Sequence, residues 1–385
     1  MSDKIEIHGF CDDRFAPVKE AFTENFKQGL ELGASAAITY KGEFVVDIWA
    51  GYADAARTKP WQEDTIVCVY STTKVMTAIC ALMLVDRGEL DIEAPVAKYW
   101  PEFAAAGKEN LPVKYLFSHS SGLAGYEPPL LGKDLYDWDR ACGQLASQEP
   151  WWEPGTASGY HAVTFGHLLG ELVRRITGRS LGRFFKEEVA DKLGADFYIG
   201  MDEKESSRVA ELIPPDPSSI EDAEELPPIG MRTLFSTNID YTDTVTHEFQ
   251  AAEIPAANGF SNARGIAKAG TALAMGGELD GHHFMSRATV ERAIQEQIYT
   301  TDLFFGMPVR YGLGFGLPDD NIPLPEGSFY WGGYGGSICQ MNLKHGYCLA
   351  YAMNKQIQSL LGDERTVKLR EAAEECLAAI IPGFK

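Results

Sequence analysis

Near the N-terminus, the pattern of apolar and polar positions changes from helical to extended within a few residues. Apolar side chains recur at helical spacing across residues 15–32, which predicts a helix that ends at Gly33. Two short apolar segments at 36–40 and 44–49 follow, and the pair Lys41-Gly42 separates them. Such a pair between two extended segments is typical of a β-hairpin, so this part of the chain predicts a helix followed by two paired strands.

The middle of the chain is mainly helical, whereas strand patterning returns near the C-terminus. Helical spacing dominates residues 71–193, and a further helix is predicted across 262–275. A last helix follows Asp363, a residue type that caps helix N-termini well. The predicted C-terminal strands cover residues 311–317, 328–331, 337–343 and 347–353.

The two ends of the chain therefore supply strands and flanking helices, while the middle supplies helices. The simplest organisation is a sheet-based α/β lobe made of residues 1–70 and 254–385, with a mostly helical lobe at 71–253 inserted into it. Residues 202–253 are acidic and rich in proline, and we interpret them as a long surface excursion of the helical lobe.

A Ser-x-x-Lys sequence, Ser71-Thr72-Thr73-Lys74, lies where an extended apolar run meets a helix that is apolar on all sides. Ser71 would start this helix, where free backbone N–H groups favour negative charge, and Lys74 would lie one turn away on the same face. A serine in this setting can act as a nucleophile without histidine. The alternative is a capping serine beside a solvated lysine, but a lysine in so apolar a helix has little access to water.

A second candidate nucleophile is Ser180, in a Gly-x-Ser-x-Gly sequence at 178–182. In α/β-hydrolases this motif follows a strand, and the tight turn lifts the serine above the sheet. Here an amphipathic helix precedes it. We therefore predict that Gly178 ends that helix and that Ser180 caps the next one.

Composition and charge restrict the possible partners. The chain has 385 residues and a formal charge of −21, without a basic patch, which argues against nucleic acid or an anionic membrane surface as a partner. The first residues lack the pattern of a signal peptide, and no apolar run reaches membrane-spanning length. Seven cysteines, an odd number, fit reduced thiols in the cytoplasm better than a disulfide framework. No cysteine or histidine spacing indicates a metal site.

Four further motifs accompany the Ser71 segment, at residues 91–103, 116–123, 154–162 and 331–337. Together, and in this order, they resemble the serine β-lactamases and penicillin-binding proteins, and most closely the class C β-lactamase-like family VIII carboxylesterases. The resemblance covers most of the chain. It implies an α/β fold of the α+β type: an antiparallel sheet flanked by the terminal helices, with an inserted helical lobe. It implies no metal or organic cofactor.

The resemblance also assigns roles to individual residues. Tyr160 matches the tyrosine of the family's Tyr-x-Asn motif, although a core tyrosine before a helix would give the same pattern. Near the Lys74 ammonium its pKa would be lowered, so Tyr160 would take the Ser71 proton and return it to the leaving group while Lys74 shares that proton. The backbone N–H groups of Ser71 and Tyr334 would form the oxyanion hole.

Two histidines near these motifs are candidate bases. His119 lies in a segment that packs beneath the site in the family, so we expect a structural role. His161 follows Tyr160 directly and would orient the loop. We find no acidic partner in the sequence that would complete a Ser-His-Asp relay.

Two departures from the β-lactamase pattern bear on the substrate. Ala162 stands where those enzymes have asparagine, and Trp331 stands where they have the lysine of Lys-Thr-Gly. Both changes remove polar groups that would bind an anionic, amide-bearing substrate, so a neutral ester is favoured. Tyr334 would add to an apolar pocket. The residues expected to contact substrate are Trp331, Gly332, Gly333, Tyr126 and Trp151.

The sequence therefore predicts a serine hydrolase that cleaves small carboxylic esters with short acyl chains through an acyl-enzyme on Ser71. Three alternatives remain open at this point. A β-lactamase or D-Ala-D-Ala peptidase would use the same nucleophile, and an acyltransferase would pass the acyl group to an alcohol instead of water. A non-catalytic binding protein would keep the fold without turnover. The sequence does not specify an oligomeric state.

Overall fold

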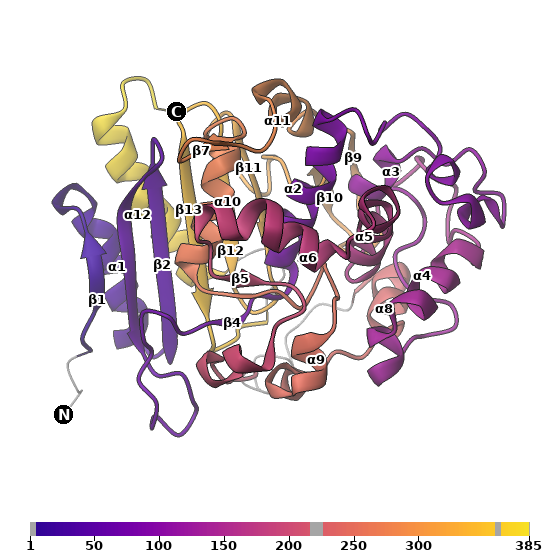
Figure 1. Cartoon of the computed structure of the whole chain (residues 1–385). Coiled ribbons are helices and arrows are strands. Elements are labelled where there is room, and N and C mark those ends of the chain that lie inside the picture. The colour runs from indigo at the N-terminus through magenta and orange to yellow at the C-terminus, as the bar shows by residue number, and fades with distance from the viewer. Residues whose placement is uncertain (1–4, 216–225, 359–362, 385) are drawn as a thin grey trace.

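The computed structural model describes residues 5–215, 226–358 and 363–384, and its centre is a six-stranded antiparallel sheet (Figure 1). The strand order is β1-β3-β2-β13-β12-β11, so the N-terminal and C-terminal strands join where β2 pairs with β13. This confirms the predicted antiparallel sheet. The strands are β1 (His8–Cys11), β2 (Gly33–Tyr40), β3 (Glu43–Gly51), β11 (Ser328–Gly332), β12 (Ile338–Asn342) and β13 (Tyr347–Met353).

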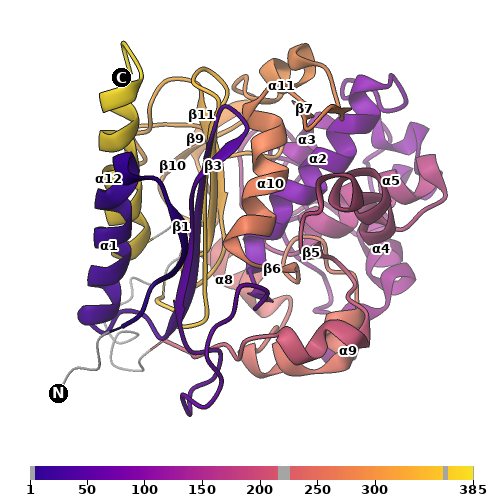
Figure 2. The ribbon, with the colours of Figure 1, turned by 60° about the vertical axis from the view of Figure 1, so that its left-hand side comes forward.

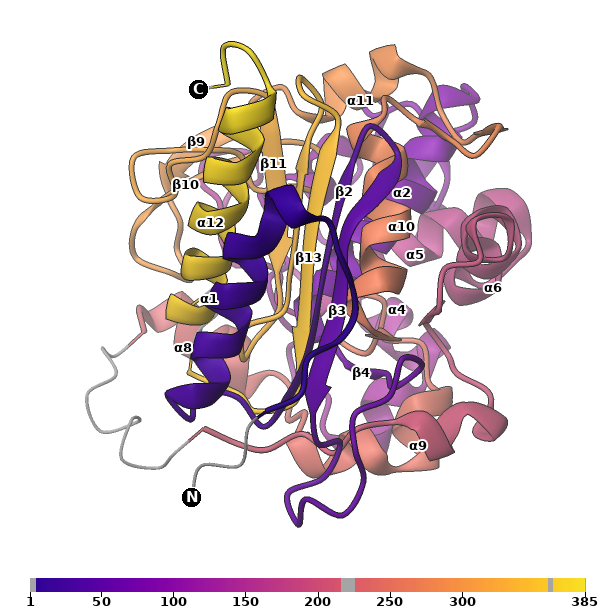
Figure 3. The ribbon, with the colours of Figure 1, turned by 90° about the vertical axis from the view of Figure 1, so that its left-hand side faces the viewer.

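Helices cover both faces of this sheet, and each face has its own apolar core. On one face, α1 (Ala16–Lys27) and α12 (Glu364–Ile380) pack side by side, as Figures 2 and 3 show. On the other face, α10 (Ala263–Ala274) lies against β13, β2 and β12. The core on this second side continues into the helical part of the molecule, so the sheet and the helices share one large apolar interior.

Most of the helices between β3 and β11 lie in the right-hand part of Figure 1, whereas α10 lies over the sheet. No helix among the described residues combines the length and the apolar character needed to cross a bilayer. The division of the chain into lobes at 70 and 254 stays a prediction. The helices are α2 (Thr73–Asp86), α3 (Lys114–Phe117), α4 (Trp138–Ser147), α5 (Thr164–Thr177), α6 (Leu181–Phe185), α7 (Asp191–Leu193), α8 (Pro228–Phe235), α9 (His247–Ala251) and α11 (Arg287–Ala293). The short strands are β4 (Val67–Cys68), β5 (Phe197–Tyr198), β6 (Phe260–Ser261), β7 (Glu278–Leu279), β8 (His282–His283), β9 (Ile298–Thr301) and β10 (Pro308–Tyr311).

Two boundaries differ from the sequence prediction. Helix α1 ends at Lys27 and the chain turns at Gly29, whose φ of +73° suits glycine, so the predicted stop at Gly33 was too late. A strand over 311–317 was also wrong. Only Tyr311 belongs to a strand, because the chain turns through Gly314, whose φ is +86°.

Residues 202–253 are more than the surface excursion that we expected. The acidic stretch at 221–225 lies outside the described residues. The rest forms α8, α9 and short turns, and Ala210, Leu212 and Phe249 are buried in the main core. Isolated parallel bridges join Val209 to Ile66 and Ile213 to Lys355. This segment is therefore packed into the body of the molecule.

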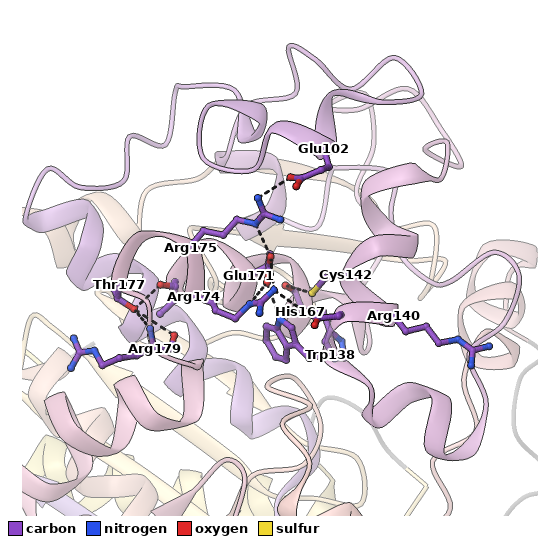
Figure 4. Close-up of polar contacts among 12 residues, drawn as sticks. Glu102, Trp138, Arg140, Cys142, His167, Glu171, Arg174, Arg175, Thr177 and Arg179 are labelled. Carbon is purple, nitrogen blue, oxygen red and sulfur yellow. Dashed lines mark hydrogen bonds and ion pairs between the residues drawn. The ribbon is translucent and has the colours of Figure 1, made fainter.

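A buried carboxylate ties α4 to α5 in the helical part (Figure 4). Glu171 is 1% exposed, and its Oε2 accepts hydrogen bonds from Trp138 Nε1 and Arg174 Nε, both at 2.7 Å. Its Oε1 accepts from Arg175 Nε at 2.6 Å and from Arg174 Nη2 at 3.0 Å. Burial alone would raise the pKa of Glu171, but these bonds hold that pKa below its usual range. Two arginines thus compensate one buried charge.

We expect Glu171→Gln to lower the free energy of unfolding by about 1–3 kcal/mol, because the new amide group would face donors instead of accepting from them. Urea unfolding measures this change. A matched control is Glu291→Gln, which removes an exposed ion pair with Arg287 and should cost less than about 0.5 kcal/mol. Equal effects of the two substitutions would show that the buried charge cluster adds nothing.

Candidate active site

Ser71 is presented by a tight turn at the start of a buried helix. The strand β4 ends at Cys68, and a single turn of 3₁₀ helix (Tyr70–Thr72) leads into α2. Tyr70 has a φ of +42°, an uncommon and strained conformation for a residue with a side chain. Ser71 is 9% exposed, so the turn leaves this side chain just within reach of solvent. The extended run that we expected to reach Ser71 is therefore only the two-residue strand β4.

Lys74 lies one turn further on and is completely buried. Its Nζ is 3.0 Å from Ser71 Oγ and 2.8 Å from Tyr160 Oη, and it donates to the backbone carbonyls of Ala162 (2.7 Å) and Ala256 (3.0 Å). No carboxylate is among these partners. Because burial disfavours the charged form, the pKa of Lys74 lies well below its usual value. The alternative of a solvated lysine is thereby excluded.

Tyr160 completes a triangle with Ser71 and Lys74, since its Oη donates to Ser71 Oγ at 2.5 Å. We expected the Lys74 cation to lower the pKa of Tyr160, and this expectation is wrong. Burial raises the pKa of Tyr160, and the hydrogen bond with Ser71 offsets this only in part. The same burial lowers the pKa of Lys74 and so disfavours the ammonium that would have stabilised a phenolate.

The two carbonyl partners of Lys74 decide where its lone pair lies. A carbonyl oxygen can only accept, so Ala162 and Ala256 each take one N–H from Nζ. A neutral amine has two N–H groups and one lone pair. With both N–H groups used, the one lone pair is left for the Ser71 hydroxyl, because Tyr160 Oη donates its proton to Ser71 Oγ. The geometry therefore makes Lys74 a proton acceptor held in a fixed direction.

The turn between β11 and β12 is fastened to the segment that carries Ser71. Ser337 Oγ donates to Val69 O at 2.8 Å and pairs with Thr72 Oγ1 at 2.9 Å. A side chain at Gly333 would meet Val69 O at 2.2 Å, so only glycine permits this approach. Among the described residues, the backbone N–H groups of Ser71 and Tyr334 have no hydrogen-bond acceptor. Both can donate to an oxyanion, and the oxyanion hole that the resemblance implies stays a prediction.

The aromatic residues predicted to contact substrate have different positions. Trp331 is 2% exposed, and its ring packs against the Tyr160 ring at a centroid distance of 5.5 Å, so it supports Tyr160 from the core. Tyr334 is half-buried and packs edge-on against Tyr70 at 5.9 Å. Trp151 is also half-buried, with the Arg232 guanidinium 4.1 Å from its ring centroid.

Tyr126 is a core residue and does not line the site. It is 1% exposed, and its Oη lies 2.7 Å from Nδ1 of His167 on α5. The prediction that it contacts substrate is not supported. Sequence reasoning misplaced Tyr126 because an aromatic residue in a loop between motifs looks the same whether its side chain turns toward the site or toward the core.

The two histidines have structural contacts, as expected. His119 Nδ1 accepts from the backbone N–H of His161 at 3.1 Å, and His161 Nε2 lies 2.7 Å from Ser121 Oγ. Burial lowers the pKa of His161 to about 4. Neither ring contacts Ser71 or a carboxylate in the described part of the chain, so a Ser-His-Asp relay is absent there.

The structure confirms the prediction that Ser180 caps a helix. Gly178, with a φ of +70°, ends α5, and Ser180 is the N-cap of α6. Its Oγ accepts from Arg183 N at 3.3 Å and donates to Glu253 Oε1 at 2.5 Å. Ser180 thus caps a helix and has no lysine or histidine partner among the described residues.

Three contributions to the site were missed by the sequence analysis. The carbonyl oxygens of Ala162 and Ala256 orient Lys74, but a backbone carbonyl has no residue-type signature. Asp302 accepts a hydrogen bond from the backbone N–H of Tyr160 at 3.2 Å. A lone aspartate in a Thr-Asp-Leu segment gives no signal either. No group of three His, Cys, Asp or Glu side chains in the described ranges is arranged to hold a metal ion.

Comparison with known proteins agrees with this geometry. The model of the Beta-lactamase family matches residues 22–374. The Esterase/beta-lactamase LipL of Mycobacterium tuberculosis is 36% identical over 370 residues, which is 92% of this chain and 84% of LipL. The crystal structure of a family VIII carboxylesterase is 42% identical, with a TM-score of 0.91, and the match covers 97% of this chain and 100% of that one.

A second solved structure is similar over the same length. It is a penicillin-binding protein homologue from Caulobacter crescentus, 38% identical, with a TM-score of 0.89 over 96% of this chain and all of that one. The predicted resemblance and fold are thus confirmed. Matches over nearly the whole length, together with a buried Ser-Lys-Tyr cluster, show that the chain belongs to the Beta-lactamase family as a serine hydrolase.

Proposed function

We propose that this protein is a carboxylesterase for small neutral esters with short acyl chains, and that Ser71 carries the acyl group. The observation that supports this most directly is the triangle of Ser71, Lys74 and Tyr160. The Ser71 hydroxyl lies within hydrogen-bond distance of two groups that can move its proton, and no carboxylate contacts either group among the described residues. LipL and a family VIII carboxylesterase are also named for esterase activity.

In the acylation step, Ser71 Oγ attacks the carbonyl carbon of the ester. The Ser71 proton moves to the Tyr160–Lys74 pair, with the Lys74 lone pair as its final acceptor. The backbone N–H groups of Ser71 and Tyr334 stabilise the negative oxygen of the tetrahedral intermediate. When the intermediate collapses, the bond to the alcohol oxygen breaks, and the alcohol leaves with the proton returned by the pair.

Deacylation repeats these steps with water as the nucleophile. The pair takes a proton from water, the hydroxide attacks the acyl carbon, and the proton returns to Ser71 Oγ as the acid leaves. Burial favours the neutral form of both groups, because it raises the pKa of the Tyr160 phenol and lowers that of the Lys74 amine. This shift favours a Lys74 lone pair that accepts the Ser71 proton.

The surroundings of the triangle favour an uncharged substrate. Ala162 takes part through its carbonyl oxygen only, and Trp331 presents an apolar ring in place of a lysine. Among the described residues, Lys74 is the one basic side chain that contacts Ser71 or Tyr160, and it is completely buried, so burial disfavours its charged form. An anionic substrate would thus lose its water without gaining an ion pair.

The corresponding prediction is a preference of about 10²-fold or more in kcat/KM for nitrophenyl butyrate over a chromogenic cephalosporin. Each missing polar partner costs roughly 1–3 kcal/mol in a desolvated site, and two are missing. Slow cephalosporin turnover agrees with the proposal, because the acylating groups are shared. Comparable kcat/KM values would contradict it and would implicate another carboxylate-binding residue, such as Arg310 or a residue of 202–253.

A β-lactam is the second candidate substrate. The full name of LipL includes β-lactamase, and the C. crescentus structure is named as a penicillin-binding protein homologue. The same acyl-enzyme would form on Ser71 when the β-lactam amide opens. Transfer of an acyl group to an alcohol instead of water would also use this intermediate. Measurement of butyl butyrate formation in the presence of butanol distinguishes transfer from hydrolysis.

We also propose that the protein works in the cytoplasm. Six of its seven cysteines are buried as free thiols, and Cys11 is half-buried. Reduced thiols of this kind persist in a reducing compartment. Fractionation of cells that produce the untagged chain tests this proposal, because esterase activity in the cell envelope or medium would contradict it.

A further inference from the structure

Asp302 is a fully buried carboxylate directly behind Tyr160. It follows β9 and begins the turn that leads to β10, and none of its surface is exposed. Its Oδ1 accepts hydrogen bonds from three backbone N–H groups: Phe304 at 2.9 Å, and Tyr160 and Phe305 at 3.2 Å. Its Oδ2 accepts from Tyr311 Oη at 3.0 Å. All four partners are donors, which is the arrangement that suits an ionised carboxylate.

The groups held by Asp302 are those that surround the Tyr160 ring. The Phe305 ring stacks on Tyr160 at 5.3 Å, and the Phe304 ring meets it edge-on at the same distance. The Tyr311 ring packs on Trp331, which packs on Tyr160 in turn. Asp302 therefore fixes the backbone of Tyr160 and, through three further bonds, the side chains that pack around it.

No cation compensates this charge among the described residues, in contrast to Glu171, which two arginines contact (Figure 4). A buried carboxylate without a cation is costly, and only its hydrogen bonds offset the cost. Burial raises the pKa of Asp302, and the bonds from Phe304, Tyr160 and Phe305 oppose this rise. An apolar residue of similar size would avoid the cost, so packing alone does not account for Asp302.

We propose that Asp302 is a positioning residue, which holds the Tyr160 hydroxyl on Ser71 in the geometry that proton transfer requires. This inference rests on the proposed function, because it assumes that Tyr160 moves the Ser71 proton. The negative charge of Asp302 has a second effect. It contributes to the raised pKa of Tyr160 and so favours the protonated phenol in the resting enzyme.

The test compares Asp302→Asn with Glu171→Gln, a substitution of the same kind at a buried carboxylate remote from Ser71. Active sites are counted with a nitrophenyl phosphonate, and kcat and KM for nitrophenyl butyrate are then measured per active site. Small displacements of a reacting group cost about 10²-fold in rate. We expect kcat of Asp302→Asn to fall by about this factor with KM changed less than about twofold, whereas Glu171→Gln keeps its kcat.

Two outcomes would overturn the inference: an unchanged kcat per active site in Asp302→Asn, or a rise in KM with kcat preserved. Tyr160→Phe is measured in parallel. If Tyr160→Phe keeps full activity, the proposed mechanism fails, and if it is inactive while Asp302→Asn is normal, only the role of Asp302 fails. Should Asp302→Asn not fold, Tyr311→Phe frees Oδ2 alone. We expect a severalfold lower kcat there, and an unchanged value would overturn the inference.

Discussion

Replacement of Ser71 with alanine is expected to abolish ester hydrolysis, with a fall in kcat on the order of 10⁴-fold or more, because no acyl-enzyme can form. Replacement of Ser180 should leave kcat nearly unchanged. Ser71 Oγ contacts Lys74 and Tyr160, whereas Ser180 Oγ contacts Arg183 N and Glu253 and caps α6. The measurement is the rate of nitrophenol release from nitrophenyl butyrate by each purified variant.

Ser180→Ala is the matched control, because it removes the same hydroxyl from the other motif that resembles a nucleophile site. It should lower the free energy of unfolding by about 1 kcal/mol, the usual cost of a lost N-cap. Thermal unfolding of both variants separates loss of activity from loss of fold. Substantial residual turnover by folded Ser71→Ala, or a large fall in kcat for Ser180→Ala, would contradict the assignment of the nucleophile.

Lys74 and Tyr160 are expected to act as one unit. Lys74→Ala, Tyr160→Phe and the double variant should show similarly low rates, because removal of either group leaves the Ser71 proton without a complete path. The structure supports this coupling, since Nζ and Oη lie 2.8 Å apart and both contact Ser71 Oγ. A double-mutant cycle on kcat/KM measures the coupling.

If the two single substitutions lower kcat/KM independently, their effects multiply in the double variant. That result would contradict the shared path for the proton. Lys74 alone would then be the base, acting directly on Ser71 Oγ across 3.0 Å. The lowered pKa of Lys74 also determines the pH dependence. Because burial lowers its pKa, activity should fall as the pH falls through the apparent pKa of the Lys74–Tyr160 pair, and this acid limb belongs to the pair and not to one residue.

The sequence predicted the three side chains that the structure brings together, Ser71, Lys74 and Tyr160, because each belongs to a short motif with its own chemical logic. A Ser-x-x-Lys at the start of an apolar helix places hydroxyl and amine on one helical face, whatever the rest of the chain does. The antiparallel sheet was equally predictable, because alternating segments at both ends of the chain must find partners. The position of Ser180 between two helices also followed from local signals, with Gly178 as the end of one helix.

Long-range contacts determined what the sequence could not show. The pKa of Tyr160 depends on burial by residues that lie far away in the chain, so its direction was predicted wrongly. The carbonyl of Ala256, the carboxylate of Asp302 and the inward turn of Tyr126 likewise depend on which segments meet. A local pattern identifies a reactive group, but the groups that hold and tune it come from the assembled fold.

The most direct test of the central claim is to map the covalent adduct that a nitrophenyl phosphonate leaves on the native protein. Intact-mass and peptide mass spectrometry should find one phosphonyl group per chain, attached to Ser71, and no adduct on Ser71→Ala under the same conditions. An adduct on Ser180 or another residue, or labelling that persists in Ser71→Ala, would contradict the acyl-enzyme mechanism proposed for this protein.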